Sequence, residues 1–223
     1  MPEPSILAVD GDLVAVDKPA GWVAHAAMEA ETHDLRAWLA AQPDLPRGLE
    51  PLHRLDRDTS GVVLYAASER TRADIGAAFM AHTVVKTYLA LVQGHAHQKG
   101  VLRAALSPDH PGPPQPAVTR YRLVEALGAF SLLRVTPETG RKHQIRRHLQ
   151  GIGLAVVGDD RYPHPRPLRV PAFPGRLCLH ASRIVLPDGR AFISDLPDDL
   201  ARCIAALQRP STGAFRAPSP ETS

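Results

Sequence analysis

Residues 53–66 read His53-Arg54-Leu55-Asp56-Arg57-Asp58-Thr59-Ser60-Gly61 and then Val62-Val63-Leu64-Tyr65-Ala66, a charged segment followed at once by an apolar run. The apolar run is typical of a buried strand. Placing so many charges beside a core is costly unless they pair with one another or meet a polar ligand. The stretch therefore predicts either a functional loop at the start of a core strand or an Asx-turn with surface ion pairs around it.

Asp56 is the candidate for chemistry within this segment. Arg54 and Arg57 are close in sequence and supply cations that can hold the carboxylate ionised. An ionised, oriented carboxylate can act as a nucleophile or as a general base.

The rest of the chain predicts an α+β fold with a mixed, largely antiparallel sheet, because hairpins cluster with a few helices between them. Residues 108–116 are too rich in proline for a helix or a central strand and predict an exposed loop. The expected strands are residues 13–17, 61–67, 84–92, 121–126, 129–135, 177–186 and 191–194. The expected helices are residues 34–42, 68–82 with Ser68 as N-cap, 141–150 and 197–208.

Two further segments carry candidate residues. Lys86-Thr87-Tyr88 lies in an expected strand, where Tyr88 is either a core tyrosine or an aromatic plate for a base. Residues 139–148 read Thr139-Gly140-Arg141-Lys142-His143-Gln144-Ile145-Arg146-Arg147-His148. Basic residues at a helix N-terminus oppose the helix dipole, which favours an anion such as phosphate at Arg141 and Lys142. A solvated basic helix face is the alternative.

Composition narrows the classes of protein. The 223 residues carry a formal charge of +3, which permits a polyanionic partner. Two cysteines are too few for a disulfide framework, and no apolar run reaches the length of a membrane span or a secretory signal, so we expect a cytoplasmic protein. His95 with His97, and His143 with His148, lack the spacing of a helical metal pair, which disfavours a metal-dependent hydrolase.

Residues 53–61 resemble one signature of the RluA family of pseudouridine synthases, and residues 139–146 resemble another. Val14-Ala15-Val16-Asp17-Lys18-Pro19-Ala20-Gly21 is similar to the first strand and turn of that family, and Leu177-Cys178-Leu179-His180-Ala181 to its C-terminal strand. The four segments occur in family order, from about residue 6 to residue 207. Together they favour the functional interpretation of each segment.

The resemblance implies a role for several residues. Asp56 matches the catalytic aspartate, Tyr88 the tyrosine that stacks on the target base, and Arg146 the arginine that pairs with the aspartate. Arg54 matches a residue that fills the gap left by the flipped nucleotide. Ile145 and Leu179 are expected to wall the uracil pocket. Lys18, Arg141 and Lys142 are expected to contact phosphate or the cleft.

The resemblance also implies a fold, a reaction and a partner. It implies the pseudouridine synthase fold with a central RNA-binding cleft, in one catalytic domain over residues 1–208. The Pro, Ser and Thr content of the tail predicts disorder over residues 209–223. Family members often carry an N-terminal S4-type domain, and we expect none here because only a few residues precede the first strand. The expected activity is isomerisation of uridine in tRNA or rRNA by a monomer, without metal or organic cofactor. An RNA-binding or RNA-folding protein that uses the same cleft is the alternative.

Overall fold

The computed structural model describes residues 2–24, 33–108 and 110–209 of the 223-residue chain. The tail predicted for residues 209–223 lies outside them apart from Arg209. In the described part, strands pair into one mixed sheet of ten strands with four helices, which confirms the predicted α+β class.

The sheet runs in the order β1-β2-β4-β9-β5-β8-β7-β6, with β3 on β4 and β10 on β9. All of its strand pairs are antiparallel except β4 with β9. The strands are β1 (Ser5–Asp10), β2 (Leu13–Lys18), β3 (Glu50–Pro51), β4 (Ser60–Ala66), β5 (Val85–Gln93), β6 (Lys99–Leu102), β7 (Thr119–Leu127), β8 (Phe130–Pro137), β9 (Leu179–Val185) and β10 (Ala191–Ile193).

Strand β9 joins two halves of the sheet. Its parallel contact with β4 is short, with Ser60 opposite His180 and Gly61 opposite Ala181. Gly61 has a φ of +115°, and a Cβ there would lie 2.2 Å from the Ala181 carbonyl oxygen, so only glycine permits this approach. On its other side β9 pairs with β5.

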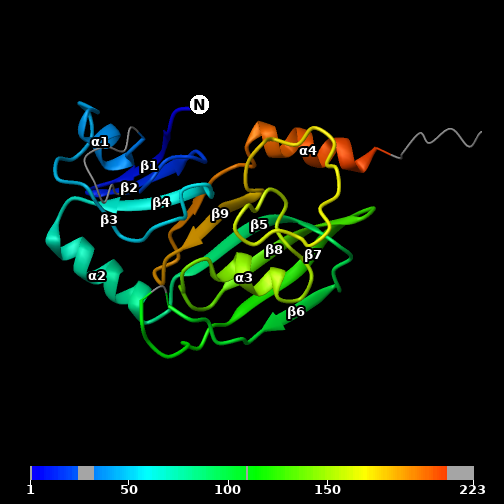
Figure 1. Ribbon diagram of the computed structural model, residues 1–223. Coiled ribbons are helices and arrows are strands. Elements are labelled where there is room, and N and C mark those ends of the chain that lie inside the picture. The colour runs from blue at the N-terminus through cyan, green and yellow to red at the C-terminus, as the bar shows by residue number, and fades with distance from the viewer. Residues whose placement is uncertain (1, 25–32, 109, 210–223) are drawn as a thin grey trace, which may run out of the picture.

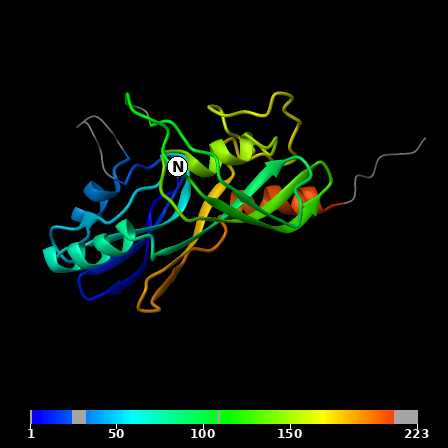
Figure 2. The same ribbon diagram turned by 90° about the horizontal axis from the view of Figure 1, so that it is seen from below.

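Each half of the sheet is covered by one helix on each face (Figure 1). In the half that contains β1–β4, α1 (Leu35–Ala40) and α2 (Glu69–Met80) pack on opposite faces. In the half that contains β5–β8, α3 (Gln144–Gln150) and α4 (Asp198–Gln208) do the same. Figure 2 shows α1 and α2 together at one end of the molecule, with α3 nearer its middle and α4 beyond it. Tyr88 packs against the α1 core and the α3 core, so it marks the junction of the halves.

Most predicted elements are confirmed within a few residues, but α3 begins later than predicted. The prediction started it at Arg141, whereas the helix begins at Gln144. The Gln144 side chain accepts a hydrogen bond from the Arg141 amide (3.0 Å), and His143 adopts a left-handed φ of +53°. Residues 141–143 therefore form a turn, and the Arg141 amide is not available to a phosphate.

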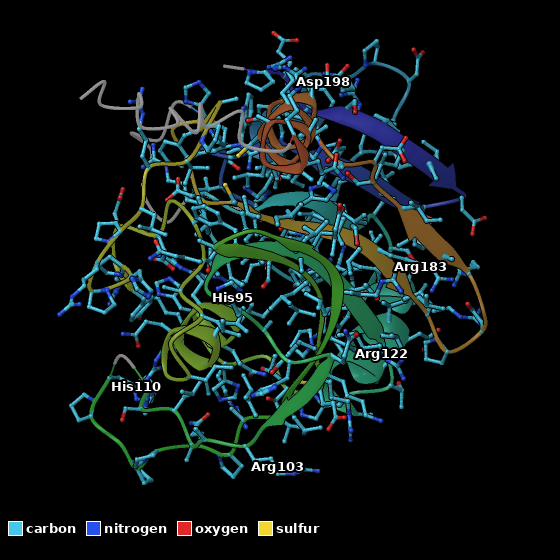
Figure 3. All side chains as sticks on the ribbon, turned by 90° about the vertical axis from the view of Figure 1, so that its right-hand side faces the viewer. His95, Arg103, His110, Arg122, Arg183 and Asp198 are labelled. Atoms are coloured by element: carbon cyan, nitrogen blue, oxygen red, sulfur yellow. The ribbon has the colours of Figure 1, made fainter. Side chains whose placement is uncertain are left out.

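The proline-rich segment is exposed, as predicted, in the residues of it that the structure describes. It belongs to the connection between β6 and β7, where Leu106 and Gln115 pair across its base. Arg103 and His110 of this connection lie at the opposite end of the molecule from Asp198 (Figure 3). None of the described helices is long and apolar enough to cross a membrane.

Candidate active site

A cleft of about 620 Å³ lies where the two halves of the sheet meet. It gathers all of the predicted site residues except Lys18. Its lining consists of His53, Arg54, Leu55, Asp56, Thr59, Phe79, Met80, His82, Lys86, Tyr88, Pro137, residues 139–146 and Leu179.

Asp56 lies in the turn before β4, and its side chain is 25% exposed to the cleft. The turn is closed by a hydrogen bond from the Thr59 amide to the Asp56 carbonyl (3.1 Å). Behind it, the Arg57 carbonyl accepts from the Gly21 amide at 2.9 Å and from Lys18 Nζ at 2.7 Å. The carboxylate therefore stands on a backbone that is fixed from the side away from the cleft.

The prediction that Lys18 contacts phosphate is wrong. Lys18 is fully buried, and its ammonium donates to the carbonyls of Pro19, Trp22 and Arg57 at 3.0, 2.7 and 2.7 Å. These three acceptors match the three donors of an ammonium. Lys18 ties the turn after β2 to the Asp56 turn and does not reach the cleft.

Arg146 is aimed at Asp56 by a second carboxylate. Its Nε and Nη2 donate to the two oxygens of Asp159 at 2.7 Å each, and Nη1 lies 3.5 Å from Asp56 Oδ2. The Asp159 side chain is completely buried. Burial alone would raise the pKa of Asp159, but hydrogen bonds from Arg146 and from the backbone amides of Tyr162 and Arg161 outweigh it and lower that pKa. Such bidentate pairs fix a guanidinium in one plane.

His143 is a further neighbour of Asp56. Its Nε2 lies 3.7 Å from Asp56 Oδ1, and its Nδ1 lies 3.2 Å from the Tyr162 hydroxyl. Tyr162 also lies under the Arg146 guanidinium, 5.3 Å from its ring centroid. Burial lowers the pKa of His143, and the charges of Arg146, Arg161 and Lys142 lower it further, while Asp56 opposes them. The ring is therefore neutral at neutral pH.

Tyr88, Ile145 and Leu179 form the apolar part of the cleft. Ile145 and Leu179 are buried, and both belong to the core that α3 covers. The pairing of β5 with β9 shifts register between Thr87 and Leu89, which places Tyr88 at an irregularity of the sheet. Burial, followed by the charge of Asp56, raises the pKa of the Tyr88 hydroxyl, so it keeps its proton.

The predicted cations lie at the outer rim of the cleft, which we define as Arg54, Arg141 and Lys142. Arg54 and Lys142 are exposed and Arg141 is half-buried. The Arg141 side chain donates to the Pro116 carbonyl at 3.2 Å, so the proline-rich segment is tied to the rim.

Asp159, Tyr162 and His143 were not among the predicted site residues. Asp159 and Tyr162 lie in an irregular segment after α3 that carries no periodic pattern. His143 lies inside the predicted motif, but its left-handed backbone is not visible in the sequence. Within the described ranges, no three His, Cys, Asp or Glu side chains are grouped closely enough to hold a metal ion.

The sequence of this chain is similar to those of known RNA-modifying proteins. The family described as RNA pseudouridylate synthase matches residues 12–151. The tRNA pseudouridine synthase C of Pectobacterium carotovorum subsp. carotovorum is 35% identical over 81% of this chain and 54% of its own length. The ribosomal large subunit pseudouridine synthase D of Nitrosomonas europaea is 36% identical over 91% of this chain and 65% of its own length. The chain thus spans about half of the first relative and 65% of the second.

A solved structure supports the fold. The human RNA pseudouridylate synthase domain containing 4 protein superposes with a TM-score of 0.77 at 24% identity, over 91% of this chain and 92% of that one. This chain belongs to the RNA pseudouridylate synthase family. The predicted family and its fold are therefore confirmed.

Proposed function

We propose that this protein isomerises uridine to pseudouridine in structured RNA, with Asp56 as the catalytic residue. The observation that carries the proposal is the carboxylate pair around Arg146. Asp159 is buried and holds the guanidinium by two hydrogen bonds of 2.7 Å, while Asp56 is partly exposed to the cleft and lies 3.5 Å from the same guanidinium. One carboxylate fixes the cation, and the other is left available to a substrate.

The reaction breaks the N1–C1′ bond, rotates the base and joins C5 to C1′, after which C5 loses its proton. Asp56 either adds to the sugar or removes a ribose proton, and both routes require an ionised carboxylate. Arg146 pairs with that carboxylate and orients it. Tyr88, Ile145 and Leu179 would hold the uracil ring while it turns, because they line the cleft with apolar surface beside Asp56.

Structured RNA is the proposed substrate, and the outer rim supports it. The uridine must leave its stack, since the ribose carbon and the ring are otherwise covered. Arg141, Lys142 and Arg54 line the cleft, where the first two would contact phosphates and Arg54 would enter the gap left by the flipped nucleotide. The relatives named for tRNA and for the large ribosomal subunit support both classes of RNA. We further propose one catalytic domain over residues 1–208, acting as a monomer in the cytoplasm.

The test is to map pseudouridine in tRNA and rRNA from cells with and without the gene, by carbodiimide-dependent stops of reverse transcriptase. The deletion strain is then complemented with wild type or with Asp56→Asn. We expect at least one stop to vanish in the deletion and to return only with wild type. Asp56→Asn should lower isomerisation by at least about a thousandfold, as loss of a central catalytic group does.

Binding of the same RNA should be largely unchanged in Asp56→Asn, because the amide keeps the size of the side chain. Asp58→Asn, two residues away on the exposed side of the same turn, is the matched control and should keep activity. Restoration of the stop by Asp56→Asn would remove Asp56 from the catalytic role. If no stop changes in the deletion strain while the protein still binds RNA, the results would favour the alternative of an RNA-binding or RNA-folding protein.

A further inference from the structure

The cleft extends beyond the residues used above. We call His53, Phe79, Met80, His82 and Lys86 the α2 end of the cleft, since three of them lie at the C-terminus of α2 or just after it. Lys86 and Tyr88 share one face of β5. Lys86, at the α2 end, is therefore about 6.6 Å along the strand from Tyr88, since a strand rises about 3.3 Å per residue.

Phe79 is held as a flat surface at this end. Its ring stacks on His53, with the centroids 4.9 Å apart and the planes at 29°. Lys86 Nζ lies 6.0 Å from the Phe79 centroid. His53 is fixed in turn, because its Nε2 accepts from the Leu64 amide at 3.1 Å and burial lowers its pKa to about 3. The His53 ring stays neutral, so Phe79 stacks on an uncharged ring that is held in place.

Met80 stands beside this surface and is 82% exposed. The helix ends at Met80, and His82 then turns the chain with a left-handed φ of +57°. An exposed methionine at the rim of a cleft is a flexible apolar contact for a ligand. Lys86, Arg141 and Lys142 line the same cleft, and this charge favours a nucleotide of an anionic chain over an apolar peptide.

We propose that the α2 end is a binding subsite for the base of a nucleotide next to the target uridine, with Phe79 and Met80 as its contact surface. The inference rests on the proposed function, which supplies the RNA and places the uridine at Asp56. It assigns to this end part of the affinity for the RNA beside the uridine, because a stacked base contributes affinity without any contact to the reacting atoms.

The experiment uses the pentaribonucleotide AAUAA and two versions of it, each with an abasic residue on one side of the uridine. Fluorescence anisotropy gives the Kd of each RNA for wild type, Met80→Ala, the double variant Phe79→Ala/Met80→Ala, and Val124→Ala. Val124 is 46% exposed, does not line the cleft and serves as the control. Thermal melting of each variant reports whether it folds.

Wild type and Val124→Ala should bind one of the abasic RNAs at least about fivefold more weakly than AAUAA, which is the loss expected for one stacked base. The double variant should bind all three RNAs within about twofold of one another, and Met80→Ala, whose exposed side chain is not needed for folding, should show part of that loss of discrimination. The proposal is overturned if wild type binds the three RNAs equally or binds none of them. It is also overturned if the folded variants discriminate as wild type does.

Isomerisation is measured separately, in the complementation assay described above. Discrimination between the RNAs without isomerisation in cells would count against the proposed function and leave the subsite standing. Isomerisation without discrimination would count against the subsite alone.

Discussion

The charged side chains at the floor of the cleft, which are Asp56, Arg146 and Asp159, are held differently from those at its outer rim. Arg146 is 8% exposed and lies between Asp159 and Asp56, whereas Arg54 and Lys142 reach into solvent. A buried charge must have its partner built in, because removing it from water costs several kcal/mol. The exposed side chains of Arg54 and Lys142 keep much of their hydration and would contact the phosphates of the proposed RNA substrate. Side chains are therefore fixed by buried partners where the reaction is proposed to occur, and they are exposed to solvent where RNA is proposed to bind.

Asp159→Asn should have the largest effect on the buried charges around Arg146. Arg146 would lose its buried counter-charge, and we expect the free energy of unfolding to fall by about 3–5 kcal/mol. Denaturant unfolding measures this, with Asp160→Asn, its exposed neighbour, as the control. A loss as small as that of the control would show that Arg146 does not depend on Asp159.

The same variant should have a distinctive pH dependence. The pKa of Asp159 is lowered below its ordinary 3.8. The stability it contributes is thus fully present above that value and is lost as the pH falls through the lowered pKa. Below pH 3.8 the free energy of unfolding of wild type should therefore decline more steeply than that of Asp159→Asn. Parallel acid limbs in the two proteins would contradict the pairing.

Lys18→Met tests the support behind the floor. It would remove the ammonium donor from the carbonyls of Pro19, Trp22 and Arg57, of which Arg57 alone keeps the Gly21 amide, and we expect a loss of on the order of 3 kcal/mol in unfolding free energy. Because Lys18 does not reach the cleft, the salt dependence of RNA binding by the folded variant should not change. Lys99→Met, at an exposed position on β6, is the control. A shallower salt dependence in Lys18→Met would instead indicate that Lys18 contacts phosphate.

His143→Ala should have a smaller effect, confined to the proposed activity. The ring is neutral and its contact of 3.7 Å with Asp56 exceeds hydrogen-bond length, so the variant loses only weak polar and packing contacts, and we expect kcat/KM to fall about fivefold, or ~1 kcal/mol. The pKa of His143 lies below its ordinary 6.5. In wild type the ring should gain a proton only as the pH falls below 6.5 and then compete with Arg146 for Asp56, which lowers the rate.

His143→Gln should lack this acid step in a pH–rate profile, and His110→Ala, an exposed histidine, should retain it. An unchanged profile in His143→Gln would assign the step to another group.

Lys142→Gln, at the outer rim, should have the smallest effect. Loss of one phosphate contact should weaken binding of total tRNA about threefold near physiological salt, and the slope of log K against log salt should drop by about one. Stability should be unaffected. Lys99→Gln is the control, and equal slopes for the two variants would place Lys142 outside the RNA path.

Much of the fold could be predicted from local patterns. Ser68 was expected to cap α2, and its side chain accepts from the Thr71 amide there. Strands β4, β5, β7 and β8 follow continuous or alternating apolar residues. The short strand β6 was missed because it carries no such alternation, and its Gly100 lies against the Tyr121 ring, which takes the place of a side chain.

The candidate site was harder to predict from the sequence than the fold, because its residues are distant in sequence. Asp56 and Arg146, which are 90 residues apart, were paired through the family resemblance. Asp159 has no motif of its own, and only its two hydrogen bonds with Arg146 reveal it. Lys18 shows the opposite error, since a lysine beside a turn suggests an exposed charge and burial depends on tertiary packing.

The place of β9 between β4 and β5 also dictates when the cleft can exist during synthesis. Asp56, Tyr88 and Arg146 have all been made once the chain reaches α3, yet the strand that joins their two halves begins only at Leu179. The Ser60–His180 contact closes a separation of 120 residues. Contacts so far apart are slow to form and await the emergence of the later partner from the ribosome. A nascent chain that stops before β9 thus contains every proposed catalytic group but lacks the strand that brings them together. We therefore expect the proposed activity only after β9 has been synthesised.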